Sequence, residues 1–188
     1  MTRSADFFDA LTRTRPMLMG IVNVTPDSFS DGGRYDDEET AVAHGRRLLA
    51  EGAHILDIGG ESTRPGATPV SPADEQARVL PVITGLRAAV REAGAFISID
   101  TRHASTMAAA LEAGADIIND VTALTCDPDS LAMAASHDCP VMIMHMQGEP
   151  QSMQHAPHYQ DVLAEVIAYL EDRLAACEAA GIARHRLM

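Results

Sequence analysis

The chain alternates short apolar runs with longer amphipathic stretches, and this alternation constrains its fold more than any other feature of the sequence. Five short runs are nearly continuous in Ile, Val, Leu or Met, which is typical of parallel strands covered on both faces. Helical patterns separate these runs, so the sequence predicts an α/β fold built on a parallel sheet. The predicted strands are Met17–Val24, His54–Gly59, Ala95–Asp100, Asp116–Val121 and Pro140–Met146, and the predicted helices are Asp36–Glu51, Pro72–Glu92, Ala104–Ala113, Asp129–His137 and His158–Ala180.

The predicted helices carry start and stop residues. Ser71, Pro72 and Asp74 place a capping hydroxyl, a first-turn proline and a carboxylate at one helix start. Pro81 predicts a break inside that same helix. A repeated Glu- and Gly-containing segment ends four helices with a glycine that can adopt the left-handed conformation. Its copies are Glu51–Ala53, Glu92–Ala95, Glu112–Ala115 and Glu178–Gly181.

The length of the chain limits how much of such a fold it can form. Its 188 residues fall short of the roughly 250 residues of a complete (β/α)₈ barrel. Only Ile182–Met188 follow the last repeat, so the chain stops where a sixth strand should begin. We therefore expect about five βα units with an open edge at Pro140–Met146.

The charge balance argues against several kinds of partner. The chain has 14 basic residues, all of them Arg, against 27 acidic residues, which gives a net charge of −13. This acidity argues against nucleic acid and against an anionic membrane surface. An anionic substrate would need a local Arg cluster, backbone donors or a metal ion. Three cysteines without a C-x-x-C pair, and the lack of an apolar leader in Met1–Pro16, predict a cytoplasmic protein with reduced thiols.

Polar loops follow the first two predicted strands, at the end where parallel α/β folds bind ligands. Asn23 opens the loop Val24–Gly33, which is long and chemically varied; a turn that serves only backbone geometry is the alternative. The second strand leads into Asp57–Gly66, where two hydroxyls and Arg64 predict an anion clamp. The alternative there is a surface loop in which Arg64 pairs with Glu61.

The next two strands end in a carboxylate and an amide, Asp100 and Asn119. Adjacent strand ends of this kind can face a heterocycle that offers both donors and acceptors, such as the edge of a pterin or a guanine. In the alternative, Asp100 caps the following helix and Asn119 satisfies a loop. On the fifth strand, the period of two places Met142, Met144 and Met146 on one face, either as core filler or as ligand contacts.

These segments together resemble the dihydropteroate synthase family, the pterin-binding transferases of folate synthesis. The resemblance covers the chain from about residue 17 to its end. We therefore interpret residues 17–188 as a C-terminally incomplete pterin-binding domain of the (β/α)₈ TIM-barrel type and residues 1–16 as an N-terminal lead-in. The segments that carry the resemblance are Met19–Gly33, Asp57–Gly66, Ser98–Arg102, Ile118–Val121 and Met144–Gly148.

The resemblance implies an enzyme that condenses 6-hydroxymethyl-7,8-dihydropterin diphosphate with p-aminobenzoate, releasing diphosphate and 7,8-dihydropteroate. It implies Mg²⁺ as the cofactor, with Asn23 as the metal-binding residue. The implied catalytic residues are Asp31 and Asp100, which stabilise positive charge on the pterin, and Arg64, which stabilises the departing diphosphate. The remaining implied substrate-binding residues are Thr63 at the diphosphate, Asn119, Val121 and Met144 at the pterin, and Phe29 and Pro65 at the aminobenzoate.

The chain departs from the family in what it lacks. Family members continue through strands that carry an Asp-Pro-Gly loop, a site Lys and an Arg-x-His pair, and they usually dimerise through late helices; this chain has none of these and no Lys at all. The resemblance therefore predicts the N-terminal part of such an enzyme. The alternatives are a non-catalytic pterin-binding remnant and a methyltetrahydrofolate methyltransferase-like domain. The Thr25–Gly33 and Ser62–Gly66 loops count against the latter, because a methyl carrier without diphosphate does not need an Arg and hydroxyl clamp.

Overall fold

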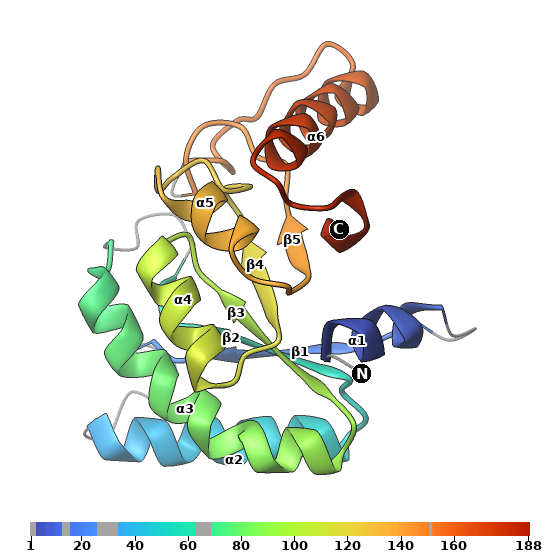
Figure 1. The fold of residues 1–188 in the computed structure, drawn as a ribbon. Helices are drawn as coiled ribbons and strands as arrows, with labels where there is room; N and C mark the ends of the chain where they lie inside the picture. The colour runs from blue at the N-terminus through green and yellow to red at the C-terminus, as the bar shows by residue number, and fades with distance from the viewer. Residues whose placement is uncertain (1–2, 13–15, 26–33, 63–68, 151) are drawn as a thin grey trace.

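The computed structural model describes residues 3–12, 16–25, 34–62, 69–150 and 152–188. It contains one parallel sheet in the order β1-β2-β3-β4-β5, which confirms the predicted fold class (Figure 1). The strands are β1 (Met19–Asn23), β2 (Ile55–Gly59), β3 (Phe96–Asp100), β4 (Ile117–Asp120) and β5 (Val141–Ile143). The helices are α1 (Arg3–Leu11), α2 (Arg34–Ala50), α3 (Pro72–Glu92), α4 (Ala104–Ala113), α5 (Ser130–Ala135), α6 (Val162–Ala179) and the short 3₁₀ helix η2 (Arg184–Arg186).

The start and stop residues act as the sequence predicts, with two differences. Ser71 caps α3 by accepting the N–H of Asp74 at 3.1 Å. The helix-ending glycines all have positive φ: 103° at Gly52, 65° at Gly94, 116° at Gly114 and 98° at Gly181. The first difference is that α6 begins at Val162 rather than His158, because Asp161 is its N-cap and accepts the N–H of Ala164.

The second difference is at Pro81, where the predicted break is wrong. The helix α3 runs without interruption from Pro72 to Glu92, with Pro81 inside it. Proline inside a helix costs about 3 kcal/mol. The same helix buries Val79, Val82, Ile83, Leu86 and Val90 in the core, and each such side chain contributes roughly 1.5–3 kcal/mol. Burial on both sides of Pro81 therefore outweighs the loss of one backbone hydrogen bond.

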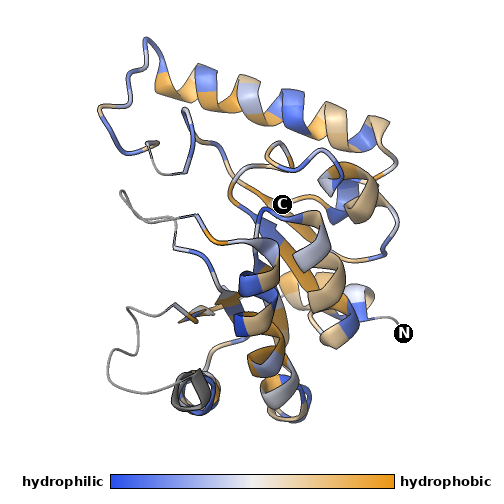
Figure 2. Ribbon diagram, turned by 90° about the vertical axis from the view of Figure 1, so that its left-hand side faces the viewer, coloured by the Kyte–Doolittle hydropathy of each residue, from blue (hydrophilic) through white to orange (hydrophobic). Residues whose placement is uncertain are grey.

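The two faces of the sheet are covered differently. Alternate strand residues such as Leu56, Ile58, Ile97 and Ile99 join the main core with the helices α2 to α4, which follow one side of the sheet in Figure 1. The helix α1 lies on the other side. The strands are largely hydrophobic, whereas α6 is mixed in character (Figure 2). Among the described helices, none is both long enough and apolar enough to cross a lipid bilayer.

The helix α1 closes the inner face of the sheet near the amino ends of the strands. Phe7 and Ala10 of α1 form a second core with Ile55, Phe96 and Ile117, which lie on β2, β3 and β4. From the sequence alone, residues 1–16 are only a lead-in. The structure shows that α1 contributes a core side chain, Phe7, that is fully buried.

An arginine fixes α1 in place. Arg3 makes two 2.8 Å hydrogen bonds to the carboxylate of Asp116, one from Nε and one from Nη2. Its Nη2 also donates to the carbonyl of Ala95 at 2.7 Å, and its guanidinium lies 4.7 Å from the centroid of the Phe96 ring. This geometry combines a bidentate ion pair with a cation–π contact.

The two edges of the sheet differ. At β5, Ile143 donates to the carbonyl of Met188 at 2.8 Å and Met188 donates to Val141 at 3.0 Å, so the chain pairs in parallel with β5 where a sixth strand was predicted to begin. The predicted open edge is therefore partly covered. At β1, the inward-facing Ile21 is 59 % exposed, because five strands form an open sheet instead of a closed barrel.

We predict that Phe7→Ala lowers the free energy of unfolding by about 3–5 kcal/mol, the usual cost of removing a buried aromatic ring. Urea denaturation followed by circular dichroism measures this. Leu11→Ala, on the same helix but 44 % exposed, is the matched control and should cost less than about 1 kcal/mol. Equal effects of the two changes would contradict a core role for α1.

Candidate functional site

The strand register places three of the predicted site residues in one row. Asn23 pairs with Gly59, Gly59 with Asp100, and Asp100 with Asn119, at the carboxyl ends of β1 to β4. Met142 on β5 continues the row. Residues at the same level of a parallel sheet point to the same face. The side chains of Asn23, Asp100 and Asn119 therefore share the inner face of the sheet, as a ligand site at this edge requires.

A glycine in this row gives the Asp100 carboxyl group room. A Cβ atom at Gly59 would lie 3.4 Å from Oδ2 of Asp100. The Asp100 carboxyl group thus lies against the backbone of β2, between the positions of Asn23 and Asn119 in the row. A larger side chain at position 59 would compete with this carboxyl group for the same space.

Asn119 bonds to a second acid, Asp57, which lies one level lower on the inner face. Its Nδ2 donates to Oδ2 of Asp57 at 3.1 Å. Asp57 is 6 % exposed, and its Oδ1 has no hydrogen-bond partner among the described residues. Burial raises the pKa of Asp57, and hydrogen bonding partly opposes this effect. The interpretation of Asn119 as a residue that only satisfies a loop is therefore wrong.

Asp100 has an unusual charge state. Its burial, and then the nearby carboxylates of Asp57, Asp120, Glu75 and Glu61, raise the pKa of Asp100 to about 8. Asp100 does not cap the following helix: the N-cap of α4 is His103, and the N–H of Ala104 donates to Asp127 instead. Asp100 is thus a protonated or easily protonated acid in a row of polar groups, which is typical of functional sites.

An ion pair joins the segments that follow β2 and β3. Arg102 donates from Nε and Nη2 to the two carboxylate oxygens of Glu61, each at 2.8 Å. Burial alone would raise the pKa of Glu61, but the bonds from Arg102 and from the Val70 N–H lower it below the usual value. In the predicted alternative, Glu61 pairs with Arg64. Arg64 would have to compete with Arg102 for Glu61, because both carboxylate oxygens of Glu61 are already bonded to Arg102.

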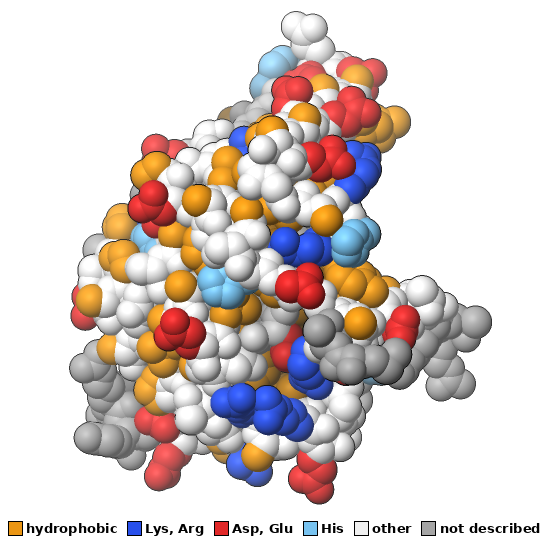
Figure 3. All heavy atoms as spheres, viewed as in Figure 1, with side chains coloured by type: hydrophobic (Ala, Val, Ile, Leu, Met, Phe, Trp, Pro, Cys, Tyr) orange, Lys and Arg blue, Asp and Glu red, His pale blue; other side chains and the backbone are white. Residues whose placement is uncertain are grey.

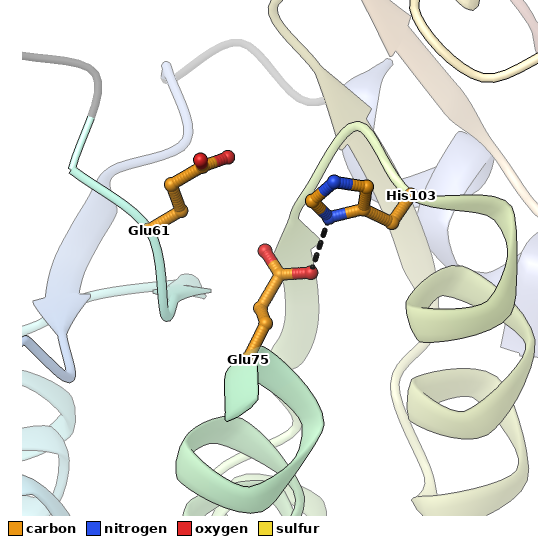
Figure 4. Close-up of side chains that lie close together, drawn as sticks. All are labelled: Glu61, Glu75 and His103. Atoms are coloured by element: carbon orange, nitrogen blue, oxygen red, sulfur yellow. Dashed lines mark hydrogen bonds and ion pairs between the residues drawn. The ribbon is translucent and has the colours of Figure 1, made fainter. Parts of the chain in front are cut away.

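A buried acid, Glu75, holds the residues that follow Asp100. Glu75 lies in the first turn of α3 and is fully buried. Its Oε2 accepts the hydroxyl of Thr101 at 2.8 Å and lies 3.0 Å from Nδ1 of His103. Figure 4 shows Glu75 and His103 bonded to each other, with Glu61 on the facing segment. Acids therefore hold all three residues that follow Asp100: Glu61 bonds to Arg102, and Glu75 bonds to Thr101 and His103.

Glu61, Glu75 and His103 each offer one ligand atom, and these atoms all lie within 4.8 Å of one another. Such a set has the donor types of a metal site. However, Glu61 is already neutralised by the guanidinium of Arg102, and a dication there would be repelled by it. We therefore interpret this cluster as an ion-pair network that fixes the loops.

The other predicted residues divide into two groups. Val121 and Met144 directly follow β4 and β5 and are half-buried, so the structure places their backbone at the same edge. The remaining five lie outside the residues that the structure describes, and their roles stay predictions. These five are Phe29, Asp31, Thr63, Arg64 and Pro65.

The sequence alone assigns no role to Asp57, Glu75 or Arg102. The sequence contains one signal for Asp57, which is a charged residue in a continuous apolar strand. Because it stands two positions before Gly59, it must lie on the same face of the strand as Gly59. Glu75 had none, since an acid in the first turn of a helix is normally explained by the helix dipole. The role of Arg102 depends on the approach of two loops.

Five parallel βα units with a polar row at the carboxyl ends of the strands define a ligand-binding protein of the (β/α) barrel class. Comparison with known families extends this: the model of the pterin binding enzyme family matches residues 19–188. The chain belongs to this family.

Individual relatives agree with this assignment. The chain is 54 % identical over 175 residues to the dihydropteroate synthase of Neisseria meningitidis serogroup C, covering 92 % of this chain and 60 % of the relative. The structure of Xanthomonas albilineans dihydropteroate synthase with 4-aminobenzoic acid superimposes with a TM-score of 0.83 at 53 % identity, covering 93 % of this chain and 60 % of that one.

A Xanthomonas albilineans dihydropteroate synthase in complex with 7,8-dihydropteroate gives a TM-score of 0.75 at 44 % identity, over 94 % of this chain and 59 % of that one. The chain thus spans about 60 % of the length of the relatives that it matches.

We predict that Asp100→Asn stabilises the chain at neutral pH. Between its ordinary pKa of 3.8 and the raised value of about 8, the folded chain keeps a proton that the unfolded chain has released. The free energy of unfolding therefore falls as the pH rises through this window. Asn carries no charge, so the variant should lose this dependence and gain about 1–3 kcal/mol at pH 8.

Urea denaturation at several pH values between 4 and 9 tests this prediction. Asp172→Asn, at an exposed position on α6, is the control for the loss of one negative charge. A pH dependence in Asp100→Asn as steep as in the parent chain would show that another group causes it.

Proposed function

We propose that this chain carries the pterin-binding edge of a dihydropteroate synthase, which condenses 6-hydroxymethyl-7,8-dihydropterin diphosphate with p-aminobenzoate to give 7,8-dihydropteroate and diphosphate. The observation that supports this most directly is the row of Asn23, Asp100 and Asn119 on the inner face, with Asp57 behind it. Relatives solved with 4-aminobenzoic acid and with 7,8-dihydropteroate support the choice of substrates.

Asp100 and Asn119 bind the pterin in this proposal. A pterin edge offers several N–H donors next to ring-nitrogen and carbonyl acceptors, and a carboxylate beside an amide provides the complementary set. The amide of Asn119 is oriented by Asp57, whose Oδ2 accepts one of its two N–H donors. Val121 and Met144 flank the ring, because both half-buried residues follow strands next to the row.

Charge stabilisation provides most of the catalysis in this proposal. An arylamine is already an unprotonated nucleophile at neutral pH, so departure of the diphosphate is the difficult step. Arg64 and Thr63 bind the departing diphosphate, and Asp31 and Asp100 stabilise the positive charge that develops on the pterin. Phe29 and Pro65 form the aminobenzoate pocket.

Asn23 is the proposed ligand of a divalent cation, Mg²⁺. Its side chain is exposed at the carboxyl end of β1, two strands from Asp100 in the same row. Amide and carboxylate oxygens are ligands that Mg²⁺ accepts, so the donor chemistry of this edge fits the ion. When bound, the cation supplies charge neutralisation to the diphosphate leaving group.

We predict that Asp100→Asn weakens binding of 6-hydroxymethyl-7,8-dihydropterin at least about 100-fold. A carboxylate has two charged oxygens that can accept hydrogen bonds from two adjacent N–H donors, whereas an amide has one neutral acceptor oxygen. Isothermal titration calorimetry measures this. Since burial and neighbouring acids raise the pKa of Asp100 to about 8, affinity in the parent chain should increase as the pH rises from 6 through 8 and level off above about pH 9. Unchanged affinity in the variant would disprove the assignment of Asp100.

We predict that Asn23→Ala raises the Mg²⁺ concentration needed for half-maximal diphosphate release about tenfold or more, because one oxygen ligand is lost. Release of diphosphate from both substrates, with and without EDTA, provides the measurement. Pterin binding in the absence of metal should be unchanged, which separates metal binding from pterin binding. Pterin binding with no dihydropteroate formed under any condition would deny this chain activity on its own, though not its membership of the family.

A further inference from the structure

A cleft lies at the amino ends of the strands, opposite the candidate site. Its volume is about 340 Å³, which is within the range of small-molecule sites. It opens between α1, the second half of α3, the end of α4 and the segment before β5. Its charged and titratable lining residues are Arg3, Arg87, Arg91, Asp116, His137 and Asp138.

The Arg87 side chain packs closely against a glycine in this cleft. Gly114 ends α4 with φ of 116°, and a Cβ atom there would lie 2.8 Å from Cδ and 2.9 Å from Nε of Arg87. The guanidinium end of Arg87 therefore lies against the bare backbone of Gly114.

Positive charge exceeds negative charge in the cleft, although the whole chain carries a net charge of −13. The charge of Asp116 is already neutralised within the chain. Both its carboxylate oxygens accept hydrogen bonds from Arg3, and one also accepts the N–H of Ile97. Among the described residues, the guanidinium groups of Arg87 and Arg91 form no hydrogen bond and no ion pair. Figure 3 shows basic side chains gathered on the lower part of this face, where the end of α3 lies in Figure 1.

Arg87 and Arg91 are four residues apart on α3. Residues at this spacing are neighbours on a helix surface, and like charges there destabilise the helix by about 0.2–0.5 kcal/mol. The C-terminal dipole of α4 can account for Arg87. The C-terminal dipole of α3 itself can account for Arg91, which lies in the last turn of that helix. Neither dipole accounts for the cleft that both residues line, whereas an anion between the two guanidinium groups would account for the two neighbouring positive charges and for the cleft beside them.

We propose that this cleft binds a phosphate-type oxyanion, either inorganic phosphate or the phosphate group of a small molecule. Arg87 and Arg91 are the anion ligands, since planar guanidinium groups bind phosphate oxygens in a bidentate manner. Arg3 neutralises Asp116, so that this carboxylate does not oppose an anion in the cleft. The site is distinct from the proposed diphosphate site, because its residues precede β3, β4 and β5 whereas Asp100 and Asn119 end β3 and lie late in β4.

Calorimetric titration of inorganic phosphate at low ionic strength tests the proposal. We expect R87Q/R91Q to weaken phosphate binding at least tenfold. The matched control is R46Q/R47Q, which removes the same number of positive charges from exposed positions on the neighbouring helix α2, outside the lining of the cleft, and should change the affinity less than twofold. Both pairs are exposed, so circular dichroism should show the parent fold in each variant.

A third variant, R64Q, identifies binding at the proposed diphosphate site. Loss of phosphate binding in R64Q with no change in R87Q/R91Q would overturn the proposal, and so would equal weakening in R87Q/R91Q and R46Q/R47Q. Failure of the parent chain to bind phosphate at millimolar concentration would overturn it as well. Titration with a phosphate monoester such as glycerol phosphate then distinguishes the two sources: binding much tighter than that of inorganic phosphate indicates a phosphorylated small molecule.

Discussion

The in-register parallel pairing of β1 to β4 is the constraint on which the rest of this structure depends. It aligns Asn23, Gly59, Asp100 and Asn119 in one row, although they come from four strands far apart in the sequence. A shift of one residue in any strand would move its polar residue to the outer face, where the main core lies. The apolar residues that alternate with the row, such as Ile58 and Ile99, prevent such a shift, because it would expose them.

Burying acids at and around this row destabilises the folded chain, and hydrogen bonds and ion pairs from the surrounding residues offset only part of that cost. Glu61 is neutralised by Arg102, and Glu75 bonds to Thr101 and His103. Asp100 has no such cationic partner among the described residues, and its pKa rises accordingly. Proteins commonly leave a local destabilising feature of this kind at functional sites. A donor-rich ligand or a cation would supply the interactions that Asp100 lacks in the free chain.

The two ends of the sheet have opposite electrostatic character. The carboxyl ends of the strands gather Asp57, Asp100, Glu61 and Glu75, and the amino ends are flanked by Arg3, Arg87 and Arg91. The helix α1 connects the basic end of the sheet to the core, because Phe7 packs on the inner face and Arg3 is bonded to Asp116. An acidic chain can therefore present a local basic surface at the amino ends of its strands.

Local patterns in the sequence determined the number of strands and their order along the chain. They also determined the glycines that end the helices and the strand-end residues Asn23, Asp100 and Asn119. These features depend on periodicity and on backbone preferences, which act over a few residues. Only the tertiary structure decided that Asp57 bonds to Asn119, Glu61 to Arg102 and Arg3 to Asp116, because these partners are 62, 41 and 113 residues apart. It also decided that α3 continues through Pro81, since the burial of that helix against the sheet outweighs the local preference of proline. Contacts of this kind arise from strand register and helix packing, which no single segment of the sequence encodes.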